Sequence, residues 1–268
     1  MTSAAPRPDC RLLTDSAVVD LARAGTIVLD SWHLYDGAGV AVDRHRDRFT
    51  AHVRAVFDVG AEESAAAYDH ALAHLPVEGS WFPAFVWTAA GLRLLVRPFP
   101  VEQLRRTTTL LLRPTLDARK RPDIKGFDYL SQTYALRDAT DAGYDDQVLA
   151  TSDGSLSETV FATLVLARGG ELIVPDAPRL DSVTLSVLRE RAGRPVRAAT
   201  VTASHLLTAP AVFTLSALHG VRVVERVNDA SYEPNPALRD RLQAALQGAR
   251  QPVADLLPQG ISLPCASC

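Results

Sequence analysis

The most constraining feature of the sequence is a series of short, β-rich apolar runs in its second half, separated by glycine turns. Residues 146–160 hold two runs around Asp153-Gly154, and residues 161–175 hold two more around Gly169-Gly170. Paired runs with such turns predict β-hairpins. Two further helix–strand units are expected over residues 182–202 and 204–224, and a last helix over Pro236–Gln247. The second half is therefore predicted to form a mixed sheet or barrel with covering helices.

The first half predicts a smaller α/β unit. Helical spacing is expected over residues 16–25, 43–60 and 61–75, and β-like runs over 26–37, 81–89, 92–100 and 107–114. We therefore predict an α/β (α+β) chain with two lobes. The predicted boundaries are a small N-terminal lobe over residues 1–115 with a leader at 1–15, a polar connection at 116–124, and a larger lobe over 125–268.

Composition excludes several classes of protein. The chain has 268 residues, 47% of them hydrophobic, and a net charge of −3, which is typical of a soluble globular protein and not of a disordered chain or a nucleic-acid binder. No apolar run is long enough to predict a membrane span, and the N-terminus lacks the pattern of a secretory signal. The three cysteines, Cys10, Cys265 and Cys268, predict no disulfide framework and favour the cytoplasm. We interpret the Cys265–Cys268 pair as part of a tail.

The basic residues are strongly biased, with 26 arginines and two lysines, Lys120 and Lys125. Any chemistry that needs a primary amine therefore has two side-chain candidates. Lys125 precedes a predicted helix, Tyr129 lies four residues further on, and Glu158 follows a glycine turn. An amine that forms an imine, a phenol and a carboxylate that holds a ring nitrogen protonated are the groups that pyridoxal phosphate (PLP) needs. Lys120 has no such context and is expected at the surface.

This segment resembles the class IV aminotransferases, the fold-type IV PLP enzymes, which include branched-chain and D-amino-acid aminotransferases and 4-amino-4-deoxychorismate lyases. The family pattern runs K-x-x-N-Y-L, then E-A-x-x-x-G-x-D-E, then D-x-x-G-x-(V/L)-(S/T)-E. The matching residues are Lys125-Gly-Phe-Asp-Tyr129-Leu, Asp138-Ala139, Gly143-Tyr-Asp145-Asp146 and Ser152-Asp-Gly154-Ser-Leu-Ser-Glu158. The resemblance implies a two-lobed fold-type IV enzyme that binds PLP between its lobes as a homodimer, with a Lys125 Schiff base and Glu158 on the pyridine nitrogen.

The resemblance extends to the residues expected around the cofactor phosphate. His45-Arg46-Asp47-Arg48-Phe49 is similar to the family's H-x-x-R-(L/F), Ser182-Val183-Thr184 takes the place of G-(I/V)-T, and Phe213 to Ala217 that of a second phosphate loop. The implied cofactor-binding residues are Arg48, Lys125, Tyr129, Glu158, Val183, Thr184 and Ser216.

Some positions depart from the family pattern. The usual early D-R-(G/A)-x-x-Y-G-D-G-x-F-E run is absent, Ser182 replaces a glycine, Ala217 a hydroxyl residue and Thr163 an asparagine. Ser31 lies where a substrate pocket is expected, although a serine in a strand is more often structural. No metal-ligand spacing and no G-x-S-x-G motif is present.

The predicted function is a class IV PLP-dependent aminotransferase that acts on an amino acid or a similar amine. An aminodeoxychorismate lyase-like enzyme that releases pyruvate is an alternative, and a non-catalytic homologue is a further one.

Overall fold

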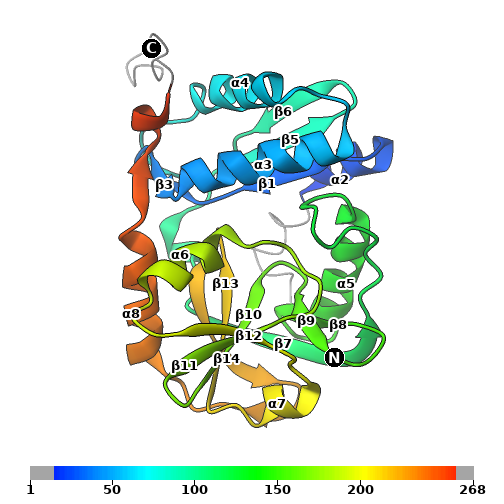
Figure 1. Ribbon diagram of the computed structural model, residues 1–268, viewed down its shortest axis with the longest axis vertical. Helices are drawn as coiled ribbons and strands as arrows, with labels where there is room; N and C mark the ends of the chain where they lie inside the picture. Colours follow the sequence, from blue (N-terminus) through cyan, green and yellow to red (C-terminus); the bar gives the residue numbers. More distant parts are fainter. Residues whose placement is uncertain (1–14, 258–268) are drawn as a thin grey trace.

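The computed structural model describes residues 15–257, except the side chains of residues 114 and 115. This part of the chain folds into two stacked lobes of helices and sheet (Figure 1). The helices are α2 (Ser16–Ala24), α3 (Val42–Val56), α4 (Ala61–Leu72), α5 (Tyr129–Asp141), α6 (Val183–Arg191), α7 (Ala203–Leu207) and α8 (Pro236–Gln247), with 3₁₀ turns η1 (Val101–Gln103) and η2 (Val253–Leu256). The strands are β1 (Val28–Ser31), β2 (Leu34–Tyr35), β3 (Ala38–Val40), β4 (Ser80–Trp81), β5 (Ala84–Thr88), β6 (Gly91–Leu95), β7 (Thr107–Leu116), β8 (Asp146–Ala150), β9 (Leu156–Thr159), β10 (Thr163–Arg168), β11 (Glu171–Pro175), β12 (Val196–Ala199), β13 (Ala211–Ser216), β14 (Gly220–Val227), β15 (Ala230–Ser231) and β16 (Arg250–Pro252).

A curled mixed sheet forms the larger lobe. Its strand order is β12-β11-β10-β13-β14-β7-β8-β9, and β15 pairs with β14. The β11–β12, β14–β7 and β7–β8 pairs are parallel, and the other neighbours are antiparallel. Helices α6 and α8 pack on this sheet through a buried cluster that includes Val187, Leu188, Phe213, Leu242 and Leu246. The prediction of a mixed α/β fold with a curled sheet is confirmed.

The predicted hairpins are present. β8 and β9 pair antiparallel around Asp153-Gly154, and β10 and β11 around Gly169-Gly170. Gly169 and Gly170 have φ values of 60° and 86°, the left-handed conformation that both central residues of a type I′ turn need. The glycine pair thus forms the two-residue turn that joins β10 to β11.

The smaller lobe is a three-stranded sheet, β1-β5-β6, covered by α3 and α4. Helix α3 buries Val42, His45, Phe49 and Val53, spaced three and four residues apart on one face. That face packs against Trp32, Tyr68 and Phe85, and the Tyr68 and Phe85 rings stack with centroids 4.3 Å apart. The packed aromatic core holds β1 and α3 in fixed positions above the large sheet (Figure 1).

Strand pairing crosses the predicted lobe boundaries at two places. β7 belongs to the large sheet, although residues 107–115 were expected in the small lobe. At the other end of the chain, β16 pairs with β3, and Figure 1 shows this segment rising past α8 to the small lobe. The boundaries 1–115, 116–124 and 125–268 stay a prediction.

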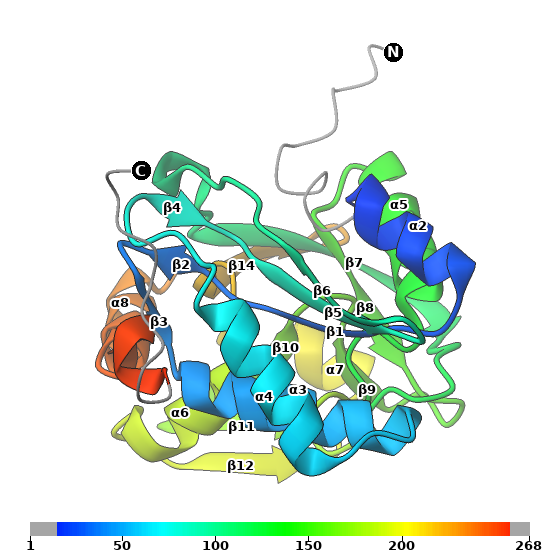
Figure 2. The ribbon, with the colours of Figure 1, turned by 90° about the horizontal axis from the view of Figure 1, so that it is seen from above.

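The predicted leader apart from Asp15, and the three cysteines, lie outside the described residues. Helix α2 lies beside α5 (Figure 2). Within residues 15–257, no helix combines the length and the apolar character needed to cross a membrane.

Candidate active site

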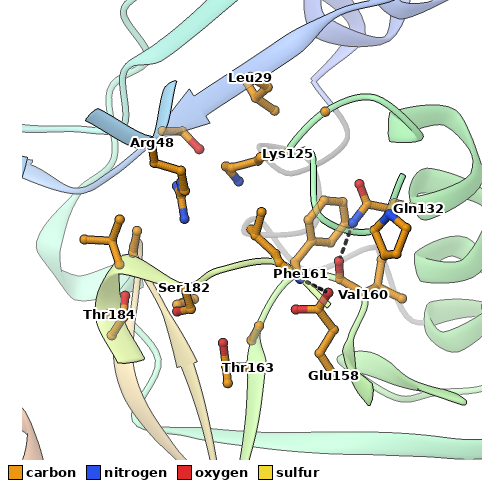
Figure 3. Close-up of a pocket in the computed structure, with 18 of the residues that line it drawn as sticks. Leu29, Arg48, Lys125, Gln132, Glu158, Val160, Phe161, Thr163, Ser182 and Thr184 are labelled. Carbon is orange, nitrogen blue, oxygen red and sulfur yellow. Dashed lines mark hydrogen bonds between the residues drawn. The ribbon is translucent and has the colours of Figure 1, made fainter. Parts of the chain in front are cut away.

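All seven residues predicted to bind the cofactor line one cavity between the two lobes. Figure 3 shows Arg48 and Lys125 on one side of this cavity, with Ser182, Thr184 and Glu158 on the others. The seven are Arg48, Lys125, Tyr129, Glu158, Val183, Thr184 and Ser216. Segments far apart in the sequence therefore meet at one place.

The backbone of Lys125 is locked against the small lobe. Its carbonyl oxygen accepts a hydrogen bond from the Leu29 amide at 2.9 Å, and its amide donates to His52 Nδ1 at 3.3 Å. The next residue, Gly126, has φ +94°, and a Cβ there would lie 2.7 Å from the Leu29 nitrogen. Glycine at this position thus allows the close approach that aims Lys125 at the cavity.

Lys125 is half-buried and lines the cavity, and within residues 15–257 its amine has no hydrogen-bond or ion-pair partner. Burial, and then the charge of Arg48, lower its pKa from 10.5 to about 8, against the pull of Asp30 and Glu158. An amine with this pKa is partly neutral near physiological pH, the form that is nucleophilic.

Glu158 lies in β9 with only 4% of its surface exposed. Its Oε1 accepts hydrogen bonds from Arg119 Nη1 at 2.8 Å and from the Leu180 amide at 3.1 Å. Arg119 is in turn held by Asp117, with an Nη2–Oδ2 distance of 2.6 Å. Burial raises the pKa of Glu158, although Arg119 opposes the shift. No hydrogen bond within the described part of the chain uses Oε2, which leaves one carboxylate oxygen as an acceptor.

Arg48 projects from α3, and only the two terminal nitrogens of its guanidinium group are hydrogen-bonded. Its Nη2 donates to Asp30 Oδ1 at 2.8 Å, and its Nη1 to the Asp181 carbonyl at 3.1 Å. The buried Nε has no hydrogen-bond partner among residues 15–257. Burial alone would raise the pKa of Asp30, but Arg48 and His45 hold it well below its ordinary value. Asp30 is thus a fixed negative charge that orients Arg48.

The first turn of α6 faces the cavity. The Ser182 hydroxyl caps the helix by accepting a hydrogen bond from the Leu185 amide at 3.2 Å. The amides of Val183 and Thr184 come earlier in this turn, where no carbonyl of the helix can serve them. Amides at a helix N-terminus favour a negatively charged ligand. The serine that replaces the family's glycine therefore takes a capping role.

Tyr129 and Ser216 also have roles in the fold. Tyr129 begins α5, and its ring packs edge-on against Phe161 with centroids 6.3 Å apart. Burial raises the pKa of its phenol. The Ser216 hydroxyl accepts a hydrogen bond from the His219 amide at 3.1 Å. Both residues reach the cavity while they stabilise their own segments.

Two residues at this site were not predicted, Asp30 and Arg119. Asp30 is the one charged residue of the buried strand β1, and this is the signal that could have singled it out. Arg119 is one of 26 arginines and stands in a polar stretch that reads as a connection. Ser31 and Thr163 line the cavity too, whereas Lys120 is exposed, as expected.

Comparison with known proteins places the chain in a family. The model of the amino-transferase class IV family matches residues 28–227. The chain belongs to the class IV aminotransferase family. No curated protein sequence matches it.

Solved structures of this fold are similar but distant. A putative 4-amino-4-deoxychorismate lyase from Legionella pneumophila is 18% identical, with a TM-score of 0.69 over 85% of this chain and 92% of that one. A branched-chain aminotransferase from Thermoproteus uzoniensis is 14% identical, with a TM-score of 0.70 over 85% and 90%. A hypothetical aminotransferase from Mycobacterium tuberculosis, in a PLP-bound form, is 18% identical, with a TM-score of 0.69 over 85% and 91%.

Class IV aminotransferases are PLP-dependent enzymes, and this chain is one of them. The cavity fits the cofactor on two observations. The Lys125 amine has no partner among the described residues, and the buried Nε of Arg48 is a cationic donor that lacks one.

Proposed function

We propose that the chain is an aminotransferase that works through the amine of Lys125, with an amino acid or a similar amine as substrate. The observation that carries this proposal is the position of that amine. It has no hydrogen-bond or ion-pair partner within the described residues, and Lys125 lines the same cavity as Glu158 and as Arg48, whose Nε is also unpaired.

The cofactor would be held at both ends. When bound, PLP supplies an aldehyde for a primary amine and a ring that withdraws electrons from the substrate carbon. Arg48, the amides of Val183 and Thr184, and Ser216 would bind the phosphate, since guanidinium groups and helix N-termini suit its oxygens. Glu158 would hold the ring nitrogen, with Tyr129 as a further contact.

Lys125 would also move the proton. Its amine has a pKa of about 8, so it can take a proton and release it again near neutral pH. Its backbone is locked between β1 and α3, which restricts the space that Nζ can sweep. The same nitrogen can therefore carry a proton between neighbouring atoms on one side of the cavity.

Glu158 would act as a fixed carboxylate. Arg119 occupies one of its oxygens and stabilises the charged form against burial. The other oxygen is then available to accept a hydrogen bond from a protonated nitrogen.

Absorbance spectroscopy with borohydride reduction tests this proposal. Protein incubated with PLP is expected to gain a near-ultraviolet to visible band, and reduction should attach the label to Lys125. Lys125→Ala should lose both the label and the activity, whereas Lys120→Ala, a change at the other, exposed lysine, should keep them. A wild-type protein that takes up no PLP would contradict the proposed PLP-dependent activity.

A lyase reaction that releases pyruvate is the second candidate. The favouring observation is the similarity of the whole fold to the putative 4-amino-4-deoxychorismate lyase, of which this chain spans 92%. Incubation with aminodeoxychorismate separates the two. Pyruvate released without an amino acceptor would contradict transamination, and transfer from an amino donor to a keto acid would support it.

The homodimer and the cytoplasmic location expected from the sequence also remain proposals. Light scattering during gel filtration tests the first, and a mass of one chain in solution would contradict it. The three cysteines in 268 residues support the second, which cell fractionation tests.

A further inference from the structure

A second, smaller cavity adjoins the site and contains no acidic residue. It shares Ser31, Lys125, Phe161, Ser216 and Ala217 with the main cavity. Its lining residues are Ser31, Phe82, Lys125, Phe161, Ser216, Ala217, Leu218, His219 and Arg222. Two of these, Lys125 and Arg222, are cationic, whereas burial lowers the pKa of His219 well below its ordinary value. The volume is about 50 Å³, whereas one water needs roughly 10–15 Å³, so a small polar group fits.

Arg222 does not line the main cavity. It lies in β14 opposite Thr214 of β13, and only 6% of its surface is exposed. Among residues 15–257 it makes no ion pair, and its buried Nε has no hydrogen-bond partner. Burying an unpaired charge is costly, and buried arginines are normally paired.

The other deeply buried arginines near the site have acids beside them. Arg48 contacts Asp30 at 2.8 Å, and Arg119 contacts Asp117 at 2.6 Å and Glu158 at 2.8 Å. Arg222 thus differs from Arg48 and Arg119 because it forms no ion pair with an acid among the described residues.

Asp146 is the acid whose pKa responds to Arg222, but other groups already use its carboxylate. Burial raises the pKa of Asp146, and Arg222 opposes that shift from a distance. Its oxygens accept hydrogen bonds from Thr159 Oγ1 at 2.7 Å and from the amides of Gln147 and Val160 at 2.8 and 3.1 Å. Asp146 therefore belongs to the β8–β9 hairpin, and its charge acts on Arg222 without a direct ion pair or hydrogen bond.

We propose that Arg222 binds the carboxylate of the substrate. A guanidinium group presents paired donors that match the two oxygens of a carboxylate. The small cavity brings this group and the Lys125 amine to a common space, free of competing acids in its lining. This inference rests on the proposed function, because it assumes that Lys125 receives an amine substrate. It adds that the substrate is an amino acid and not a simple amine.

The test uses the PLP-loaded protein and a matched pair of amines. L-alanine and D-alanine carry the carboxylate that ethylamine lacks, and each is titrated while the visible absorbance is followed. The wild type is expected to bind one alanine more tightly than ethylamine. Arg222→Met should weaken the binding of that alanine by about 10- to 100-fold and leave ethylamine unchanged, because a charged hydrogen bond is lost.

Two further variants sharpen the result. Arg222→Lys keeps the charge without the fork and should lie between the wild type and Arg222→Met. Arg226→Met is the matched control in the same strand, since Arg226 lies over the Tyr144 ring and outside the cavity. It should bind both amines as the wild type does.

Several outcomes would overturn the proposal. A wild type that binds PLP but does not distinguish either alanine from ethylamine contradicts it, as does an Arg222→Met protein that weakens both amines equally. Failure of the wild type to bind PLP would instead sink the proposed function. If Arg222→Met does not fold, a structure of the wild type with 2-oxoglutarate decides: a carboxylate on Arg222 supports the proposal, and one bound elsewhere overturns it.

Discussion

At the scale of single residues, burial and charge pairing act differently on the site's basic groups. Arg48 and Arg119 are buried beside acids and stay charged, because the acids compensate for the loss of water. Lys125 is buried without such a contact, so burial dominates and lowers its pKa to about 8. The difference suits their proposed tasks, since a phosphate needs a permanent cation and an imine needs a neutral amine.

The buried ammonium of Lys125 is expected to cost stability in the PLP-free protein. The folded pKa of about 8 lies below the unfolded value of 10.5, so stability rises with pH between these values, where the unfolded chain binds the extra proton. The gap corresponds to about 3 kcal/mol. Lys125→Met should therefore stabilise the protein by up to about 3 kcal/mol at pH 7, and the gain should shrink toward pH 10. Urea unfolding at several pH values measures this; a gain independent of pH would contradict it.

Removing Arg119 should have the opposite effect. Arg119→Met leaves the buried carboxylate of Glu158 without its cation, which typically costs about 3–5 kcal/mol. The loss should be smaller at pH 5 than at pH 8, because protonation of Glu158 removes the buried charge. Adding Glu158→Gln to Arg119→Met should recover part of the stability in urea unfolding. A double variant as unstable as Arg119→Met would show that the pair is not the cause.

Sequence reasoning could select the seven residues that line one cavity, and that we predict to bind the cofactor, because each belongs to a local motif with its own spacing. It could not find Asp30, Arg119 or Arg222. Their importance depends on burial and on whether the fold places an oppositely charged residue beside them. An arginine in a strand looks the same in the sequence whether it faces water or an empty polar cavity.

At the scale of elements, turns could be predicted better than strand neighbours. The Gly169-Gly170 hairpin follows from two adjacent residues, whereas the place of β7 between β14 and β8 depends on residues more than 30 positions away. β7 is a β-rich run, as β5 and β6 are, so its sequence alone does not tell which sheet it joins.

The connection between β1 and the segment that carries Lys125 depends on Gly126. Gly126→Ala should destabilise the protein by about 3 kcal/mol, because it adds left-handed backbone strain and a Cβ 2.7 Å from the Leu29 backbone. Gly143→Ala is the matched control, since Gly143 has a similar φ of +83° but open space around it, and should cost about 1–2 kcal/mol. Thermal unfolding compares them, and equal losses would show that the contact with Leu29 does not matter.

At the scale of the whole molecule, the chain passes between the two lobes more than once. The chain builds the small lobe first, yet β16, near the end of the described residues, returns to pair with β3. The cavity lies between lobes whose relative position is thus held by the chain at more than one point (Figure 1). Such an arrangement suits a site whose walls come from both sides.

The return of β16 predicts that the lobes unfold together. Val253 follows β16, is fully buried and packs in the small-lobe core with Phe49 and Tyr68. Val253→Ala removes two methyl groups from that core and should cost about 2 kcal/mol, while Val101→Ala, at a position 45% exposed, should change little.

Because α8 and β16 link this contact to the large sheet, urea unfolding of the Val253 variant should remain a single transition at a lower midpoint, whether followed by tryptophan fluorescence or by circular dichroism. The three tryptophans, Trp32, Trp81 and Trp87, all lie in the small lobe, so fluorescence reports on that lobe, whereas circular dichroism reports on both. Transitions that separate between the two signals would mean that the small lobe unfolds on its own and that β16 does not couple it to the rest of the chain.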